Sequence, residues 1–119
     1  LKLQQFHRIL PIEYYVKAIQ YFTPEHTFLV FSDDIEWCKN NILQHLNKYV
    51  IIQDEDYIEM YLMSNCQHNI IANSSFSWWG AYLNTYKKKI TIAPKKWFGP
   101  QGPTNVQDIF LDNWVLLDD

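Results

Sequence analysis

Small polar side chains are concentrated in residues 68–84, which read HNIIANSSFSWWGAYLN. A short apolar run ends in Asn73, Ser74, Ser75 and Ser77, and an aromatic-rich segment with helical spacing follows. A helix that begins near Ser75 leaves the backbone N–H groups of its first turn without intrahelical partners, at the positive end of the helix dipole. This arrangement predicts an anion site that fits a diphosphate, with the serine hydroxyls as further donors.

The free amides are expected to be those of Ser75, Phe76 and Ser77. Gly80 would allow close backbone contact, and three aromatic side chains are expected to hold the helix against a sheet, namely Trp78, Trp79 and Tyr82. A purely structural alternative remains open, because a Ser or Asn cap followed by a core helix would produce a similar pattern.

Two earlier apolar runs also end in polar residues, which are Ser32, Asp33, Asp34, Asp54, Glu55 and Asp56. Asp33 and Glu36 match a capping box, so a structural role explains one carboxylate and leaves Asp34 unexplained. A carboxylate there can accept hydrogen bonds from ribose hydroxyls or from the N1–H and 2-amino edge of guanine. Asp54 and Asp56 offer the same chemistry, or they simply begin a helix where its dipole favours negative charge.

A fourth apolar run is followed by Lys95 and Lys96. These lysines could offset the charge of a diphosphate, although an exposed lysine pair is usually solvated surface. None of the four histidines has a nucleophile or carboxylate partner that the sequence identifies. The catalytic residue is therefore left unassigned.

Strand-like runs alternate with helical segments of about a dozen residues along the chain. Helices are expected at 11–22, 33–46, 54–66 and 74–86, and strands at 27–32, 49–53, 69–72, 90–93 and 114–117, with loop through most of the tail after Pro94. This alternation is typical of a parallel sheet covered by helices on both faces. We expect a single Rossmann-like α/β domain, residues 1–119, whose polar strand ends gather on one rim.

Composition excludes several classes of protein. Ten basic and thirteen acidic residues give a net charge of −3, so the chain lacks the diffuse basic surface that binds nucleic acid. No apolar run approaches the roughly 20 residues of a membrane span. Cys38 and Cys66 lack zinc-ligand spacing and indicate buried thiols in a reducing compartment. We expect a cytoplasmic protein, with a peripheral position at a membrane as a further option.

Three segments carry a resemblance to a known family: FLVFSDDIEWCKNNI, HNIIANSSFSWWGAYLN and APKKWF. They closely resemble the carboxyl half of the family 11 glycosyltransferases, chiefly α-1,2-fucosyltransferases, and the likeness covers essentially the whole chain. The resemblance implies a GT-B-type enzyme whose carboxyl-side Rossmann domain holds GDP-fucose. It implies inverting transfer of L-fucose to the 2-hydroxyl of a terminal galactose on a glycan acceptor, with no metal and no cofactor besides the donor substrate.

The resemblance and the strand-end chemistry together give one set of candidate GDP-fucose-binding residues. These are Ser32, Asp33, Asp34, Asp54, Asn73, Ser74, Ser75, Phe76, Ser77 and Trp78. The family's His-x-Arg-Arg-Gly-Asp element, whose arginine supports the departing diphosphate, is not found, and Arg8 is the sole arginine in the sequence. We therefore expect the donor-binding part of a longer enzyme, either a fragment or a truncated reading frame, with little or no transferase activity of its own.

Two other hypotheses remain open. The chain could be a nucleotide- or glycan-binding module without catalytic activity that uses its exposed aromatic residues, or a structural α/β domain whose polar strand ends are only helix caps. Asn73-Ser74-Ser75 is also an N-glycosylation sequon. Because a glycan at Asn73 would block a donor cleft there, the donor-site interpretation predicts that Asn73 is unmodified.

Overall fold

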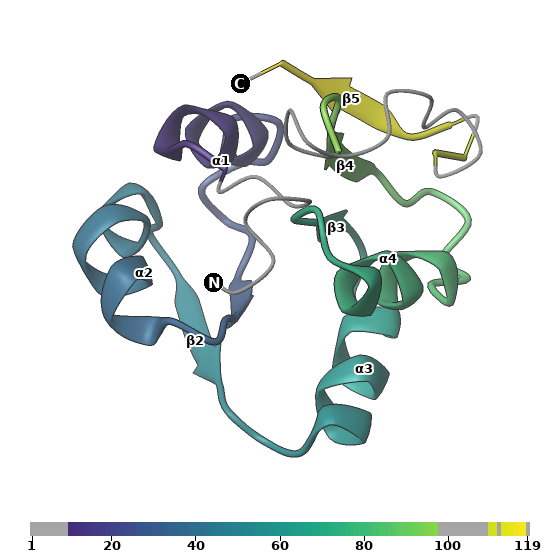
Figure 1. Cartoon of the computed structure of the whole chain (residues 1–119), viewed down its shortest axis with the longest axis horizontal. Coiled ribbons are helices and arrows are strands. Elements are labelled where there is room, and N and C mark those ends of the chain that lie inside the picture. Colours follow the sequence, from purple (N-terminus) through teal and green to yellow (C-terminus); the bar gives the residue numbers. More distant parts are fainter. Residues whose placement is uncertain (1–9, 98–109, 112, 119) are drawn as a thin grey trace.

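A computed structural model describes residues 10–97, 110–111 and 113–118 of the chain. Strands and helices alternate along these ranges as the sequence predicts (Figure 1). The elements are α1 (Ile12–Ile19), β1 (Phe28–Phe31), α2 (Ile35–Asn41), the 3-10 helix η1 (Leu43–His45), β2 (Tyr49–Ile52), α3 (Asp56–Ser64), β3 (Asn69–Ile70), α4 (Ser75–Tyr82), β4 (Thr91–Pro94) and β5 (Val115–Leu117). Arg8 and most of the loop expected after Pro94 lie outside the described residues.

The strands pair in parallel, as predicted, but they form two sheets rather than one. β1 pairs with β2, and β4 pairs with β3 on one side and β5 on the other. No ladder of hydrogen bonds joins β1 to β3 within the described ranges. The sequence led us to expect one continuous sheet, and the difference arises at β3, whose two paired residues leave little strand to offer to a second neighbour.

Helix α1 packs against both sheets. Tyr14 and Ala18 are fully buried on the side that faces Ile92 of β4. Tyr15 and Ile19 pack against the cluster beside β1 and β2. Residues four apart share a face of a helix, so the spacing of these two pairs gives α1 two adjacent apolar stripes. One helix therefore ties the two sheets together (Figure 1).

The hydroxyl of Tyr14 lies at the centre of this packing. It donates a hydrogen bond to the carbonyl oxygen of Ile71, at 2.5 Å, and lies 3.2 Å from the carbonyl oxygen of Ile92. Burial raises the pKa of Tyr14 far above its ordinary value, because a phenolate there would lose its water. The neutral hydroxyl thus links α1 to the backbones of two neighbouring strands.

The amino ends of β1 and β3 meet in an aromatic cluster. Phe22 and His26 precede β1, and their rings lie 5.1 and 5.7 Å from the ring of His68, which precedes β3. The backbone N–H of Ile90 donates to Nδ1 of His68 at 2.8 Å, which connects the cluster to the start of β4. These contacts join the segments that precede β1 and β3, although the two strands share no ladder.

Replacement of Tyr14 with Phe tests the link between α1 and the strands. We expect Tyr14→Phe to lower the free energy of unfolding by about 1–3 kcal/mol, because the buried carbonyl of Ile71 loses its donor. The matched control is Tyr57→Phe, since the Tyr57 side chain is 71% exposed, and it should change stability by less than about 0.5 kcal/mol. Urea denaturation followed by circular dichroism measures both, and equal effects would contradict the bridging role.

The His68 cluster makes stability depend on pH. Burial, with a further contribution from the neighbouring His26, lowers the pKa of His68. The folded state therefore binds this proton less tightly than the unfolded chain does. The contribution of neutral His68 to stability is complete above the ordinary value near 6.5 and is lost as the pH falls from there through the lower pKa of the folded state. We expect unfolding experiments between pH 7 and pH 5 to show a steeper loss of stability in the wild type than in His68→Gln.

The exposed His45 provides the control for this experiment. His45→Gln should keep the pH dependence of the wild type. A His68→Gln profile parallel to the wild-type profile would show that protonation of His68 is not linked to folding.

Candidate functional site

Helix α4 begins where the sequence predicts and is capped by Ser74. The Ser74 backbone is extended, and its Oγ accepts a hydrogen bond from the N–H of Ser77 at 3.1 Å. The N–H of Ser77 was expected to be free, and this cap corrects that expectation. Within the part of the chain that the structure describes, the amides of Ser75 and Phe76 remain without a hydrogen-bond partner. Two donors rather than three are left at the start of the helix.

The hydroxyl of Ser77 is also directed to the backbone. Its Oγ lies 3.0 Å from the carbonyl oxygen of Ala72, 3.1 Å from that of Ser74 and 2.7 Å from Ser74 Oγ. A single O–H group engaged in this way is not a free donor for a ligand. Ser75 is exposed, so its hydroxyl and the two amides are the donors that this helix start can offer to an anion.

Asn73 connects the loop after β3 to the loop after β4. Its side chain is buried, and Nδ2 donates to the carbonyl oxygen of Trp97 at 3.0 Å. Asn73 therefore holds two strand-end loops at a fixed distance. Because an N-linked glycan would be attached at Nδ2, the burial of this side chain agrees with the prediction that Asn73 is unmodified.

The inner face of α4 packs closely on its neighbours. Trp78 packs against the core cluster that contains Ile71 and Trp114. On the side of α3, a Cβ atom added to Gly80 would lie only 2.9 Å from Cε of Met63. The prediction that Gly80 permits a close backbone approach is thus confirmed, and the approach is to another helix.

The outer face of α4 carries aromatic residues that the sequence assigned to packing. Trp79 and Tyr82 are about half exposed, so the expectation that all three aromatic residues hold the helix against the sheet is correct for Trp78 alone. The physical reason is helical geometry, since successive residues turn by about 100° and neighbouring positions 78 and 79 cannot both face inward.

At the end of β1, Asp34 rather than Asp33 caps helix α2. Asp34 Oδ1 accepts from the N–H of Trp37 at 3.0 Å, and Ser32 Oγ accepts from the N–H of Asp34 at 2.9 Å. The capping box predicted at Asp33 and Glu36 is therefore wrong by one residue, because α2 begins at Ile35. Asp33 is exposed and has no hydrogen-bond or ion-pair partner among the described residues.

At the end of β2, both the backbone and the side chain of Asp54 are hydrogen-bonded. Its N–H donates to Oε2 of Glu59 at 2.9 Å, and its Oδ1 accepts from the N–H of Glu55 at 2.7 Å. Asp56 is the first residue of α3, where the helix dipole favours its charge. One carboxylate oxygen of Asp54 remains available to a ligand.

These two strand ends share one shallow, open depression, which is lined by Ser32, Asp33, Gln53, Asp54, Glu55, Asp56 and Glu59. Five carboxylates make it suited to hydroxyl and amino groups and unsuited to phosphate. Gln53 and Glu59 were not among the predicted residues. Glu59 could have been identified from its spacing, because a residue five positions after Asp54 can direct its carboxylate back to the Asp54 amide.

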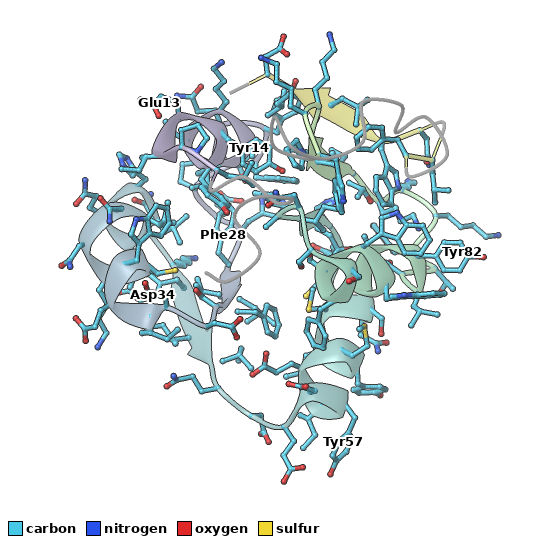
Figure 2. All side chains as sticks on the ribbon, viewed as in Figure 1. Glu13, Tyr14, Phe28, Asp34, Tyr57 and Tyr82 are labelled. Atoms are coloured by element: carbon cyan, nitrogen blue, oxygen red, sulfur yellow. The ribbon has the colours of Figure 1, made fainter. Side chains whose placement is uncertain are left out.

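The structure thus brings Ser32, Asp33 and Asp54 together but leaves residues 73–78 outside their depression. No hydrogen bond or ring contact in the described ranges joins the two groups. In Figure 2, Asp34 lies beside α2 and Tyr82 lies on the opposite side of the view. Lys95 and Lys96 follow β4 and are exposed.

The two thiols are free. Cys38 is buried as predicted, whereas Cys66 is half-buried and its thiol donates to the carbonyl oxygen of Leu62 at 3.2 Å. Burial raises the pKa of the Cys66 thiol, which makes it a weak nucleophile at neutral pH. Helices long and apolar enough to cross a bilayer do not occur in the described residues.

Comparison with known proteins identifies related sequences. The sequence model of glycosyl transferase family 11 matches residues 2–118. The O-antigen biosynthesis glycosyltransferase WbnK of Escherichia coli is 44% identical over 119 residues, which cover 95% of this chain and 38% of that protein. An alpha-1,2-colitosyltransferase of Escherichia coli is 40% identical over 121 residues, 96% of this chain and 41% of that protein.

A more distant relative is the galactoside 2-alpha-L-fucosyltransferase SEC1 of Bos taurus, which is 28% identical over 116 residues, 86% of this chain and 30% of that protein. No solved structure matches the chain. The chain spans about two fifths of the length of the two bacterial relatives.

The Ser74 cap leads to a prediction about stability. We expect Ser74→Ala to lower the free energy of unfolding by about 1 kcal/mol, because the N–H of Ser77 loses its acceptor. Ser75→Ala removes a hydroxyl one position later that caps nothing, and it should change stability by less than about 0.5 kcal/mol. Thermal and urea unfolding measure both variants, and a Ser75→Ala effect as large as that of Ser74→Ala would contradict the assigned cap.

Proposed function

The chain belongs to glycosyltransferase family 11, and from this premise we propose that it forms the donor-binding part of a galactoside 2-alpha-L-fucosyltransferase. The family acts with a nucleotide-sugar donor and a glycan acceptor. Our proposal adds GDP-fucose as the donor, the 2-hydroxyl of a terminal galactose as the acceptor group, inversion at the transferred carbon and no requirement for a metal ion. It also includes a GT-B architecture in which this chain is the Rossmann-like donor domain.

The start of α4 is the observation that carries this proposal. The amides of Ser75 and Phe76 lie at the positive end of an eight-residue helix, with no partner among the described residues. Such a position stabilises the two negative phosphates of a nucleotide sugar, in the ground state and as negative charge grows on the departing diphosphate. The exposed hydroxyl of Ser75 adds a third donor.

The strand order supports the same location. In this proposal the two sheets adjoin at β1 and β3, which the ring contact between Phe22 and His68 supports. The strand order is then β2, β1, β3, β4 and β5, and the direction of winding reverses between β1 and β3. In doubly wound sheets ligands bind beyond the carboxyl ends of the strands at this reversal. Residues 32–34 directly follow β1, and residues 73–75 come two residues beyond β3; both blocks were predicted from the sequence.

The two groups of residues would then bind different parts of the donor. The acidic depression accepts hydrogen bonds from the ribose hydroxyls or from the guanine edge, and the start of α4 binds the diphosphate. Lys95 and Lys96 at the end of β4 add positive charge beside the diphosphate. In this proposal the acceptor is bound by polypeptide beyond the present chain, and the catalytic base is left unassigned.

The bacterial relatives favour a second candidate for the transferred sugar. The alpha-1,2-colitosyltransferase is 40% identical to this chain, compared with 28% for the galactoside fucosyltransferase. A colitosyl donor is therefore the alternative to a fucosyl donor, with the same diphosphate at α4. For the location we propose the cytoplasm with peripheral attachment to a membrane, and the two free thiols agree with a reducing compartment.

Titration calorimetry with GDP, GDP-fucose and GDP-mannose tests the proposal. We expect the folded chain to bind all three, because each carries the nucleoside and the diphosphate. Addition of EDTA should leave the affinities unchanged, since amides rather than a metal neutralise the phosphates. If a folded sample binds none of the three ligands, only the hypothesis of a structural α/β domain remains. Loss of binding in EDTA would overturn the proposal that the site needs no metal ion.

The acidic depression has its own test. We expect Asp33→Asn to weaken GDP binding about tenfold, because a charged acceptor for the nucleoside is lost. Glu36→Gln removes the same charge from an exposed position outside the depression, and its affinity for GDP should match that of the wild type. Calorimetric titration of both variants makes the comparison, and equal losses would mean that the effect is one of overall charge.

A further inference from the structure

We infer that the outer face of α4 and the lysine turn that follows it bind the surface of an anionic lipid membrane. This surface, called the α4 surface below, consists of Trp79, Tyr82, Leu83, Tyr86, Lys87 and Lys88. It is distinct from the proposed donor site, and its binding to lipid requires no nucleotide.

The apolar part of the α4 surface forms one stripe. Trp79, Tyr82, Leu83 and Tyr86 are between 43% and 49% exposed. The spacing of Trp79, Tyr82 and Leu83 by three and four residues places these three on one side of the helix. Tyr86 lies beyond the end of α4, and its ring is 6.1 Å from the ring of His68. Figure 2 shows Tyr82 directed outward from α4, away from both sheets. A stripe of this kind on the solvent side of a helix indicates a contact surface.

Ring packing holds the exposed aromatic side chains in place. Tyr82 stacks on Trp78 at a centroid distance of 5.1 Å and an angle of 9° between the planes. Trp79 lies edge-on to both rings, 5.0 Å from Trp78 and 5.6 Å from Tyr82. Little side-chain entropy would therefore be lost on binding. Trp and Tyr are also the residues enriched at membrane–water interfaces, because each combines an apolar ring with a polar group.

The charge beside the stripe selects the kind of partner. Lys87 and Lys88 are exposed, whereas Lys89 donates a hydrogen bond to the carbonyl oxygen of Asn84. Residues 60–107 contain five lysines and no Asp or Glu, although the whole chain has a net charge of −3. Positive charge is therefore gathered next to the apolar stripe of an otherwise acidic protein, which is the combination that anionic lipid headgroups attract.

A second copy of the chain fits this surface less well. In a symmetric dimer the same patch is buried twice, which brings four lysines and no acidic residue of the α4 surface into one interface, so their charges oppose the pairing. An anionic bilayer has the opposite charge and also accepts the aromatic rings. The observations therefore favour the lipid surface.

The position of the α4 surface keeps the donor site open. Strand β4 separates Lys87 and Lys88, which precede it, from Lys95 and Lys96, which follow it. The proposed donor site lies at the carboxyl ends of the strands, whereas the lysine turn lies at the amino end of β4. Attachment through the α4 surface thus leaves the donor edge accessible to a water-soluble nucleotide sugar.

Vesicle co-sedimentation of the 119-residue chain tests the inference. We expect binding to phosphatidylcholine vesicles that contain phosphatidylglycerol, weak binding to pure phosphatidylcholine, and loss of binding as salt is raised. The double variant Lys87→Gln/Lys88→Gln should bind the anionic vesicles about 25-fold more weakly, at about fivefold for each lysine. Trp79→Gln should weaken binding to the same vesicles, because it removes an interfacial ring.

The matched control removes the same charge from the other end of β4. Lys95→Gln/Lys96→Gln should bind vesicles within about twofold of the wild type and should bind GDP more weakly, whereas Lys87→Gln/Lys88→Gln should bind GDP normally. Three results would overturn the inference: no binding of the folded chain to anionic vesicles at low salt, equal effects of the two double variants on vesicle binding, or a lipid-free dimer that Trp79→Gln dissociates. Since the vesicle assay contains no nucleotide, its failure would leave the donor-site proposal intact.

Discussion

The hydrogen bond from the N–H of Ser77 to Ser74 Oγ caps helix α4, and it determines which backbone amides are free at the start of the helix. By capping the helix, Ser74 sets its first residue at Ser75, and this leaves the amides of Ser75 and Phe76 as the donors at its start. Packing against the core sets the other property of this helix. Trp78 contacts the core, Trp79 is about half exposed, and Tyr82, one turn after Trp78, stacks on Trp78 and is about half exposed. The proposed diphosphate site thus depends on the cap, and the proposed membrane surface depends on how the helix packs.

Helix α1 plays the corresponding role for the sheets. The buried hydroxyl of Tyr14 fixes α1 to the backbones after β3 and in β4, while Tyr15 reaches the cluster beside β1 and β2. The His68 cluster joins the amino ends of β1 and β3. Aromatic rings occupy the amino ends of β1 and β3, and the polar residues of the candidate site lie at the carboxyl ends, where we propose that the ligand binds.

The sequence predicted the order and type of the elements because each strand and helix has a strong periodic signal, and parallel pairing followed from their alternation. It could not predict the break between β1 and β3, which depends on how many residues of the short third strand pair before the turn at Asn73. The cap of α2 was misplaced by one residue because Asp33 and Asp34 have the same side chain, and only the backbone decides between them. The outward direction of Trp79 was also missed. Hydrophobicity favours burial of every aromatic residue, whereas helical geometry allows only some positions of the helix to face the core.

The central claim is that a backbone amide at the start of α4 binds the diphosphate of the donor, and Ser75→Pro tests it directly. Proline is well tolerated at the first helical position, and the extended backbone of Ser74 is the conformation that a following proline requires, so the fold should be retained while the Ser75 N–H is removed. Ser75→Ala is the control, since it removes the hydroxyl and keeps the amide. In calorimetric titration with GDP we expect Ser75→Pro to bind at least about tenfold more weakly than Ser75→Ala. Equal affinities of the two folded variants would contradict the account.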